Sequence, residues 1–426
     1  MVYSEKFKQI LPQTVFHLLP EPEKVFLSTQ AEALRFTQQE LRIICEMALD
    51  RTRWKESSLE STWTQLASSI PNSNDRNQKK KRILASLSTQ HDALKSRENN
   101  YQSWSKKDKP KTEKPIIKTT VKTDLGLGRC PVASVKTRCC NLMTLDAVEK
   151  CGFDCSYCSI QSFYHGNQVV FDQDFAKKLD KLQLDPDKTY HIGTGQSSDS
   201  LMWGNHNGVL DALCHFARRH PNVILELKTK SRNIGWLLEN DIPKNIICTW
   251  SLNPQTIIDH EEHLSASLKQ RLDCAKQLAE KDCIVGFHFH PIIRYQGWKE
   301  DYVDITQTLC DEFDPDSVAL VSLGTLTYTK SVMKTIRQRN LNSKILQMPM
   351  EEIAGKYSYP LAMKLEMFQA VYQGLARWHD MVFFYLCMED QSLWQPVFGY
   401  QYNSNIEFES AMKSAYFHKI NKKLTS

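Results

Sequence analysis

The sequence predicts an α/β protein in which a partial (β/α)6 barrel follows a mainly helical N-terminal region. From about Leu142, six short runs of β-forming residues alternate with longer stretches of helical period, which is the pattern of βαβ units around a parallel sheet. Before Leu142, apolar residues recur mainly at helical spacing. Six strands are too few for an eight-fold barrel, so we expect an incomplete one.

Chain length predicts more than one part. At 426 residues the chain exceeds the size at which a single hydrophobic core stops growing. We expect a mainly helical region at 1–97, a basic linker at 98–122, and at 123–426 the barrel with a C-terminal extension of helix and strand. Pro110 and Pro115 would break any helix in the linker.

Two helices are expected in the N-terminal region. Thr29 and Glu32 have the spacing of a capping box, and the apolar residues that follow at helical intervals predict an amphipathic helix. A second helical stretch runs from about Leu59 to Ile70.

The barrel strands are expected where β-rich runs occur, with helical stripes between them from Val209 to Ala217 and from Leu264 to Leu278. The six expected strands are MTLDAV, TYHIGTG, VILELKT, IICTWSL, CIVGFHFHP and SVALVSLG. Because such barrels carry their chemistry at the carboxyl ends of the strands, we expect the functional residues there.

Composition favours a reduced, cytoplasmic protein. Hydrophobic residues make up 41% and charged residues 24%, which is typical of a globular chain that builds a sizeable core. The start lacks the pattern of a secretion signal, and the absence of an 18-residue apolar run argues against a membrane span. Thirteen irregularly spaced cysteines fit reduced thiols with some metal ligation better than a disulfide framework.

Positive charge is concentrated between Arg76 and Lys122. This segment holds 14 Lys or Arg against 4 Asp or Glu, whereas the whole chain has a net charge of only +5. Lysines near Tyr101 and Trp104 combine charge with stacking, as nucleic-acid-binding strands and grooves require. We therefore expect DNA or another nucleic acid as a partner of segment 76–122, although lysine-rich linkers also serve solubility alone.

Cys151, Cys155 and Cys158 form a C-x3-C-x2-C motif on a loop after the first expected barrel strand. Three thiolates so close together suit a [4Fe-4S] cluster and leave one iron open. The amino and carboxylate groups of S-adenosylmethionine (SAM) can chelate that iron, which prepares reductive cleavage to a 5′-deoxyadenosyl radical. A partial zinc site or unliganded thiols remain alternatives, but zinc usually takes C-x2-C pairs.

Other cysteines and histidines have open interpretations. Cys130, Cys139 and Cys140 could ligate a second metal, donate hydrogen to the active site, or be packed thiols, and Cys387 is equally ambiguous.

His288 and His290 alternate along one expected strand and so face the same side of it. We favour pocket-lining or buried hydrogen-bonded histidines over metal ligands for this pair. The nearby Arg294 and Tyr295 could meet a phosphate or a base.

From about Leu142 to Trp394 the sequence resembles the radical SAM superfamily and, within it, the spore photoproduct lyase family. The resemblance rests on the order of motifs that are individually short. These are CGFDCSYC, HIGTGQSSDSL, LELKTKS, WSLNP, FHFHPIIRY with a following GW, SLGTL, GKYSYP and YLCMED. It implies a partial barrel of radical SAM type and a lyase that cleaves a thymine dimer linked through the methyl carbon.

The resemblance also implies roles for individual residues. The three motif cysteines would ligate the cluster, and a flavodoxin or ferredoxin would supply the electron. Residues expected to hold SAM are Gly193, Gly195, Ser198, Lys230, Ser251 and Asn253. Tyr157 and Gln196 occupy expected catalytic positions. Plainer roles remain open, because the two glycines could serve only a turn, Lys230 could be solvated, and Asp199 could cap the following helix.

Two positions depart from the family pattern. Gln196 replaces the cysteine that gives a hydrogen atom to the product radical, and a primary amide N–H bond is too strong for that step. Ser159 replaces the tyrosine that follows the third cluster cysteine. Radical generation should survive both changes. We expect a radical SAM enzyme that acts on a nucleic-acid base. One alternative is a radical SAM enzyme with a substrate other than nucleic acid. Another is a non-catalytic nucleic-acid-binding protein with a structural metal site.

Overall fold

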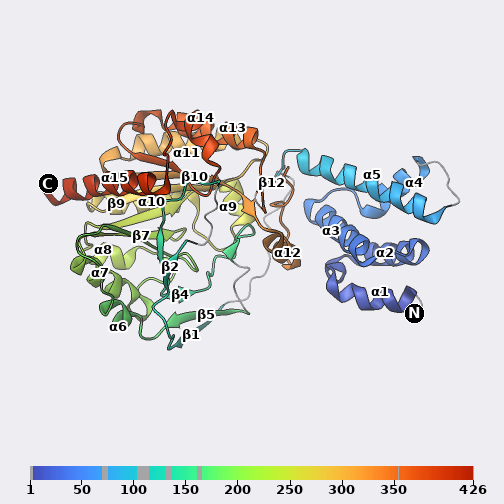
Figure 1. The fold of residues 1–426 in the computed structure, drawn as a ribbon, viewed down its shortest axis with the longest axis horizontal. Coiled ribbons are helices and arrows are strands. Elements are labelled where there is room, and N and C mark those ends of the chain that lie inside the picture. Colours follow the sequence, from blue (N-terminus) through green and yellow to red (C-terminus); the bar gives the residue numbers. More distant parts are fainter. Residues whose placement is uncertain are drawn as a thin grey trace. The chain divides into compact units, whose positions relative to one another are not determined.

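The computed structural model describes residues 3–69, 75–102, 115–130, 136–160, 166–353 and 355–425. The chain forms two compact units, and both are discontinuous in sequence. Unit 1 comprises residues 1–110 with 328–351, and unit 2 comprises 111–327 with 352–426 (Figure 1). The expected division at 97 and 123 therefore omits the excursion at 328–351 from the N-terminal unit.

Unit 1 is helical, as expected for the N-terminal region. Its elements are α1 (Tyr3–Ile10), η1 (Leu11–Gln13), η2 (Phe16–Leu18), α2 (Glu21–Leu34), α3 (Gln38–Trp54), α4 (Leu59–Ser69), α5 (Arg76–Ser96) and α12 (Lys330–Gln338). Apolar faces of the first five α-helices form one core that includes Leu27, Leu41 and Leu87. The expected second helix is confirmed as α4, although Ile70 lies outside the described residues.

The expected capping box at Thr29 and Glu32 is wrong. Thr29 lies inside α2, where its hydroxyl donates to the carbonyl of Val25 at 3.1 Å. The capping box occurs instead at Thr37 and Glu40, which start α3. The sequence offered two S/T-x-x-E patterns in succession, and the proline near the start of α2 places the earlier helix boundary upstream of Thr29.

Unit 2 is built on an eight-stranded sheet with the strand order β14-β10-β9-β8-β7-β6-β3-β2. The strands are β2 (Leu127–Arg129), β3 (Met143–Leu145), β6 (Tyr190–Thr194), β7 (Val223–Thr229), β8 (Ile246–Ser251), β9 (Ile284–Ile292), β10 (Val318–Thr325) and β14 (Phe383–Leu386). All six expected strands occur in it and pair parallel in chain order. The sheet also contains two strands that were not expected, namely β14, which pairs parallel with β10, and β2, which pairs antiparallel with β3.

Helices follow the strands, as a βαβ pattern requires. They are α6 (Phe175–Asp180), α7 (Val209–Arg219), α8 (Gly235–Glu239), α9 (Gln255–Glu261), α10 (Leu268–Glu280), α11 (Trp298–Glu312), α13 (Leu361–Gly374), α14 (Trp394–Phe398) and α15 (Asn405–Thr425), with short turns η5 (His206–Gly208), η6 (Pro315–Ser317), η7 (Ala376–Trp378) and η8 (Gln391–Leu393). α10 begins with a capping box of Ser267 and Gln270, so Leu264 is a loop residue rather than part of this helix.

Two small sheets complete the described fold. One has the order β1-β5-β4, with β1 (Ile116–Thr120), β4 (Val148–Glu149) and β5 (Gln168–Asp172). β1 pairs parallel with β5, so the last part of the expected linker at 98–122 is a strand. The other sheet has the order β11-β13-β12, with β11 (Thr327–Tyr328), β12 (Glu351–Ile353) and β13 (Lys356–Ser358). Among the helices of the described residues, none has the length and apolar character of a membrane span.

Candidate functional site

The cysteine motif lies on the loop that leaves β4. Cys155 is buried, whereas Cys151 and Cys158 are partly exposed. Lys150 and Asp154, which precede two of these cysteines, adopt positive φ angles of 74° and 55°. Non-glycine residues rarely adopt this conformation, so the surrounding structure must impose the turns that direct the thiols.

Burial favours the protonated form of two of the three motif thiols. Burial raises the pKa of the Cys151 thiol, and the charges of Asp199, Cys155 and Cys158 raise it further. Burial also raises the pKa of Cys155. Thiols that influence one another in this way are stabilised as thiolates by a bound cation, and sulfur is the donor that iron–sulfur clusters use. In the described part of the chain, no three Cys, His, Asp or Glu side chains are already arranged around one point, so the fit is one of donor chemistry.

A strap of residues 261–266, between α9 and α10, crosses the cysteine loop. The amide of Ser156 donates to the carbonyl of Glu261 at 2.8 Å, and the amide of Leu264 donates to the carbonyl of Phe153 at 3.2 Å. At its far end, the amide of Ala266 donates to the carbonyl of Lys230 at 3.0 Å. The strap therefore connects the cysteine loop with the carboxyl end of β7.

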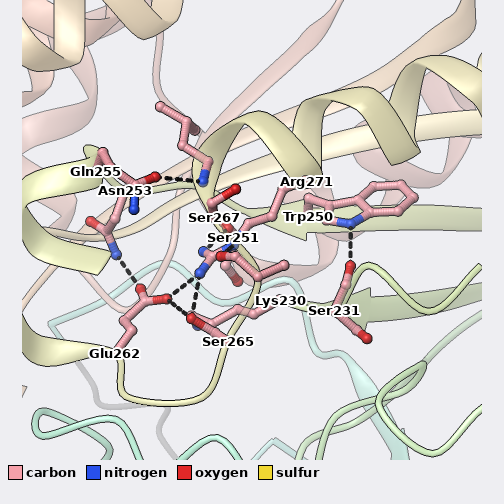
Figure 2. A network of polar contacts seen from close by, with 12 residues as sticks. Lys230, Ser231, Trp250, Ser251, Asn253, Gln255, Glu262, Ser265, Ser267 and Arg271 are labelled. Atoms are coloured by element: carbon pink, nitrogen blue, oxygen red, sulfur yellow. Dashed lines mark hydrogen bonds and ion pairs between the residues drawn. The ribbon is translucent and has the colours of Figure 1, made fainter. Parts of the chain in front are cut away.

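Glu262 of the strap is the centre of a buried polar network (Figure 2). The phenol of Tyr157 donates to Oε1 of Glu262, and Asn253 Nδ2 donates to the same oxygen at 2.9 Å. The other carboxylate oxygen accepts from Arg271 and from Ser265, the latter at 2.9 Å. Despite burial, the charge of Arg271 lowers the pKa of Glu262 to about 2, so the pair is ionised.

The residues expected to hold SAM on β7 and β8 lie around this network. Lys230 Nζ is 5.8 Å from the ring centroid of Tyr157, and the carbonyl of Ser251 accepts from Arg271 Nη1 at 2.7 Å. Asn253 is fully buried, donates to Tyr157 and Glu262, and accepts from Tyr302 at 2.7 Å. The Asn253 side chain is therefore largely occupied within the protein, whereas Lys230 and Ser251 are partly exposed.

The loop after β6 contacts both the start of the cysteine loop and the end of β7. Gly195 has φ of 77°, and a Cβ added there would lie 2.6 Å from Ser200 Oγ and 3.0 Å from the carbonyl of Lys228. Ser198 Oγ donates to the carbonyl of Lys150 at 3.0 Å, which ties this loop to the start of the cysteine loop. A Cβ added to Gly193 would lie 3.1 Å from Cδ2 of Leu142. Only glycine fits the turn at 195 without displacing backbone.

Asp199 organises the same loop. One carboxylate oxygen accepts from the amides of Leu201 and Met202 at 3.1 and 2.8 Å, and from the hydroxyl of Thr229 at 2.7 Å. The other accepts from the amide of Lys230 at 2.8 Å. Asp199 therefore caps a turn and not the following helix, because η5 begins after Asn205 and α7 after Gly208. The structure also records a small hollow here, lined by residues that include Gly195, Ser198, Asp199 and Ser200.

Sequence reasoning missed Glu262, Arg271 and Tyr302. A signal for Arg271 was available, because it falls at the i+3 position of the apolar stripe that contains Leu268 and Leu272. A charge on the buried face of a helix requires a partner. Glu262 carried no comparable signal, since it lies in an irregular loop. Gln196 and Ser159, the two departures, are both partly exposed near these elements.

The histidines on β9 do not form a metal site within the described residues. His288 is buried and bonds Glu226 Oε1 at 2.8 Å through Nε2, and the Ser322 hydroxyl at 2.5 Å through Nδ1. His191 bonds the other oxygen of Glu226 at 2.8 Å. The interpretation of His288 as a buried hydrogen-bonded residue is confirmed. Burial lowers the pKa of His290 to about 3, so it is neutral.

A second group of thiols lies within unit 2. Cys130, Cys139, Cys140 and Cys387 influence one another electrostatically, together with Lys228. The amide of Cys387 donates to Leu323 of β10, and the amide of Cys139 donates to Asn405 of α15. The hydrogen bond of Cys139 joins the segment before β3 to the C-terminal helix. They are all free cysteines.

The basic segment differs in part from expectation. Tyr101 is buried, so it is not available to stack on a base. Trp104 lies outside the described residues. Lys80 of α5 is paired with Glu40, whereas Lys81 and Arg82 are exposed.

Fold and site define a class of protein. A curled, mostly parallel sheet that carries a three-cysteine loop after its first parallel strand is the arrangement of radical SAM proteins. A family model described as Spore photoproduct lyase matches residues 147–372, more than half of the chain. The chain belongs to the spore photoproduct lyase family.

Relatives and solved structures agree with this assignment. Spore photoproduct lyase of Clostridium acetobutylicum is 23% identical over 223 residues, which are 50% of this chain and 64% of the relative. Spore photoproduct lyase of a Geobacillus species is 27% identical over 142 residues, which are 32% of this chain and 39% of the relative. The chain thus matches less than two thirds of the length of either relative.

The structural likeness has TM-scores just above one half. A mutant spore photoproduct lyase with bound AdoMet and dinucleoside spore photoproduct has a TM-score of 0.53 and 18% identity, over 64% of this chain and 82% of that chain. A spore photoproduct lyase complexed with dinucleoside spore photoproduct has a TM-score of 0.54 at 18% identity, over 65% and 86%. At this identity the likeness establishes a shared fold.

Proposed function

We propose that the protein is a radical SAM enzyme that reductively cleaves SAM at a [4Fe-4S] cluster and acts on a nucleic-acid base, in photoproduct repair or base modification. The observation that carries the proposal is the thiol loop of Cys151, Cys155 and Cys158, which residues 261–266 connect to the strand end that holds Lys230. The ion pair of Glu262 and Arg271 extends this connection to Ser251. Membership of the spore photoproduct lyase family supports the same chemistry.

The residues of the chain have separable tasks. The three thiolates would bind the cluster, and when both groups are present the cluster supplies the electron that cleaves SAM to a 5′-deoxyadenosyl radical. Lys230 would pair with the carboxylate of SAM, while the Ser251 hydroxyl would bind its polar groups. Gly195 lets the backbone approach the ligand closely, and the surrounding barrel would exclude water from the radical.

A nucleic-acid substrate is supported by two independent observations. The solved relatives carry a dinucleoside spore photoproduct, and the chain has a strongly basic segment at 76–122. A flavodoxin or ferredoxin would deliver the electron. A second candidate keeps the radical chemistry but assigns a substrate other than nucleic acid. Gln196 and Ser159 favour it, because both replace residues of the family's hydrogen relay.

Anaerobic reconstitution with iron and sulfide, followed by dithionite and SAM, tests the central proposal. We expect 5′-deoxyadenosine from the intact chain and only background from Cys155→Ala. Cys214→Ala is the matched control, because Cys214 is a buried free thiol on α7, away from the motif. If no cluster forms, or if Cys155→Ala keeps the full yield, the proposal is wrong and a structural metal in a binding protein becomes the better account.

The substrate is tested in the same assay with ultraviolet-irradiated DNA and with unirradiated DNA as control. A nucleic-acid substrate predicts that irradiated DNA raises the 5′-deoxyadenosine yield and releases repaired thymine. An unchanged yield with both DNAs, in an enzyme that still cleaves SAM, would favour the second candidate.

A further inference from the structure

We infer that Glu262, held by Arg271, is a positioning residue that fixes the cysteine loop through Tyr157. The inference rests on the proposed function, since it assigns a task toward the cluster that the loop would carry. Tyr157 lies between Cys155 and Cys158, so the position of its side chain restricts the backbone between two of the three expected ligands.

The network is built to hold one arrangement. Glu262 and Arg271 are both fully buried, and Glu262 accepts hydrogen bonds from four side chains. Figure 2 shows those from Asn253, Ser265 and Arg271, and the fourth donor is Tyr157. Arg271 also donates to the carbonyl groups of Ala266 and Ser251, at 2.9 and 2.7 Å. A buried ion pair is costly unless its polar atoms are satisfied, and a satisfied pair specifies geometry. Here the ion pair specifies the conformation of the strap and of the cysteine loop that the strap contacts.

Three kinds of contact transmit this geometry to the thiols. The Tyr157 phenol is fixed by Glu262, and the strap residues on either side of Glu262 bond the loop backbone at Ser156 and Phe153. His263 adds a bond to the Ser156 hydroxyl at 3.0 Å.

The same network also reaches the side expected to bind SAM. Ala266 bonds the carbonyl of Lys230, Arg271 bonds the carbonyl of Ser251, and Asn253 bonds Glu262 directly. Glu262 therefore connects the cysteine loop with three residues assigned to the cosubstrate. A change at Glu262 should alter the cluster environment and SAM affinity together, whereas a merely stabilising residue would alter neither in the surviving folded protein.

The first experiment uses the metal-free full chain, in which no radical chemistry can occur. Alkylation of Cys155 by iodoacetamide is followed by peptide mass spectrometry in wild type, Tyr157→Phe and Glu262→Gln. Loss of a hydrogen bond to a charged group should speed alkylation about tenfold. Tyr400→Phe is the matched control, because the Tyr400 phenol donates to the carbonyl of Phe384 outside this network. Equal rates in all four proteins would overturn the inference.

The second experiment uses the reconstituted chain. Tyr157→Phe should keep the fold, and we expect it to shift the electron paramagnetic resonance signal of the reduced cluster and to raise the KM for SAM about fivefold or more. Unchanged spectra and KM with a lower yield would assign Tyr157 to catalysis and overturn a positioning role. If wild type forms no cluster, the proposed function fails, but the alkylation rates still decide whether Glu262 positions the loop.

Discussion

Arg337 of α12 donates to both carboxylate oxygens of Asp50 on α3, at 3.1 Å from Nε and 2.9 Å from Nη2, across 287 residues of sequence. His91 of α5 approaches the same carboxylate at 3.4 Å. Burial would raise the pKa of Asp50, but the charge of Arg337 and the hydrogen bonds from His91 and Arg337 outweigh it and lower the pKa. Three helices of unit 1 therefore depend on one buried carboxylate.

Asp50→Asn should loosen these helices. Removing one partner of a buried ion pair costs about 3 to 5 kcal/mol when the other charge is left unpaired, and we expect a smaller cost here because Glu46 still faces Arg337 at 3.4 Å. Hydrogen exchange of the full chain should accelerate in the peptides of α3 and α12. Asp92→Asn is the control, because Asp92 forms an exposed pair with Lys95 and should change exchange by less than about 1 kcal/mol. Equal effects of both substitutions would contradict the assigned role of Asp50.

The contribution of Asp50 should depend on pH in one direction. A carboxyl group whose pKa falls on folding stabilises fully above its unfolded pKa of about 3.9 and loses this effect as pH falls through the folded value. The difference between wild type and Asp50→Asn in exchange protection of α3, corrected for intrinsic rates, should shrink as the pH falls below about pH 4. If the difference in exchange protection persisted undiminished below about pH 2, the ionised carboxylate of Asp50 would not be its source.

Gly195→Ala should cost more than Gly208→Ala. Both glycines have positive φ, so each alanine pays a conformational cost of about 1 to 2 kcal/mol. At 208 an added Cβ meets no atom within 4 Å, whereas at 195 it would lie 2.9 Å from the amide of Ser200. Thermal unfolding should occur at a lower temperature in Gly195→Ala than in Gly208→Ala, and calorimetric SAM binding should be impaired only in Gly195→Ala. Matching losses in the two variants would mean that the close approach at 195 is unimportant.

Cys139 should be the more reactive member of the adjacent pair Cys139 and Cys140. The hydrogen bond from Cys140 lowers the pKa of Cys139, while the same bond together with burial raises the pKa of Cys140. Iodoacetamide should therefore label Cys139 at a lower pH than Cys140 or Cys387, and labelling should increase as pH rises through the Cys139 pKa. Site-resolved mass spectrometry against pH, with Cys139→Ser as control, would reveal the opposite order if the assignment is wrong.

Basic residues of α5 should contribute to nucleic-acid binding. Lys81 and Arg82 are exposed, and replacing both by Gln should weaken binding uniformly across sequences and reduce the salt slope by about 1 to 2. Lys269→Gln on the exposed face of α10 is the control. Titration of fluorescent DNA at several salt concentrations measures both effects, and an unchanged slope would remove α5 from the interface.

Much of the barrel could be predicted because burial on both faces makes parallel strands read as continuous apolar runs. This is why VILELKT and SVALVSLG were found at nearly the observed bounds. Strand β14 was missed because it is only four residues long. Strand β1 was hidden among lysines, and all five of its residues are exposed. Periodicity carries no signal for such a strand.

Site residues could be predicted where ligand chemistry fixes their spacing in the sequence. They could not be predicted where they come together only through tertiary contacts. The cysteine motif is local, so its three residues could be identified as a possible ligand set from sequence alone. Glu262 acquires its role only when α9 and α10 bring it against Tyr157, 105 residues earlier. The hydrogen bond that Asn253 accepts from Tyr302 likewise depends on tertiary contact, because Tyr302 lies on α11, 49 residues later.

The excursion at 328–351 has a consequence for the order of synthesis. Asp50 and His91 leave the ribosome long before Arg337, and every strand from β1 to β10 is made in between. The N-terminal unit is thus first to be translated but cannot be completed until most of unit 2 has emerged. A nascent chain that ends before residue 337 lacks the arginine partner of Asp50, so unit 1 gains this ion pair only after the barrel segment up to β10 has been translated.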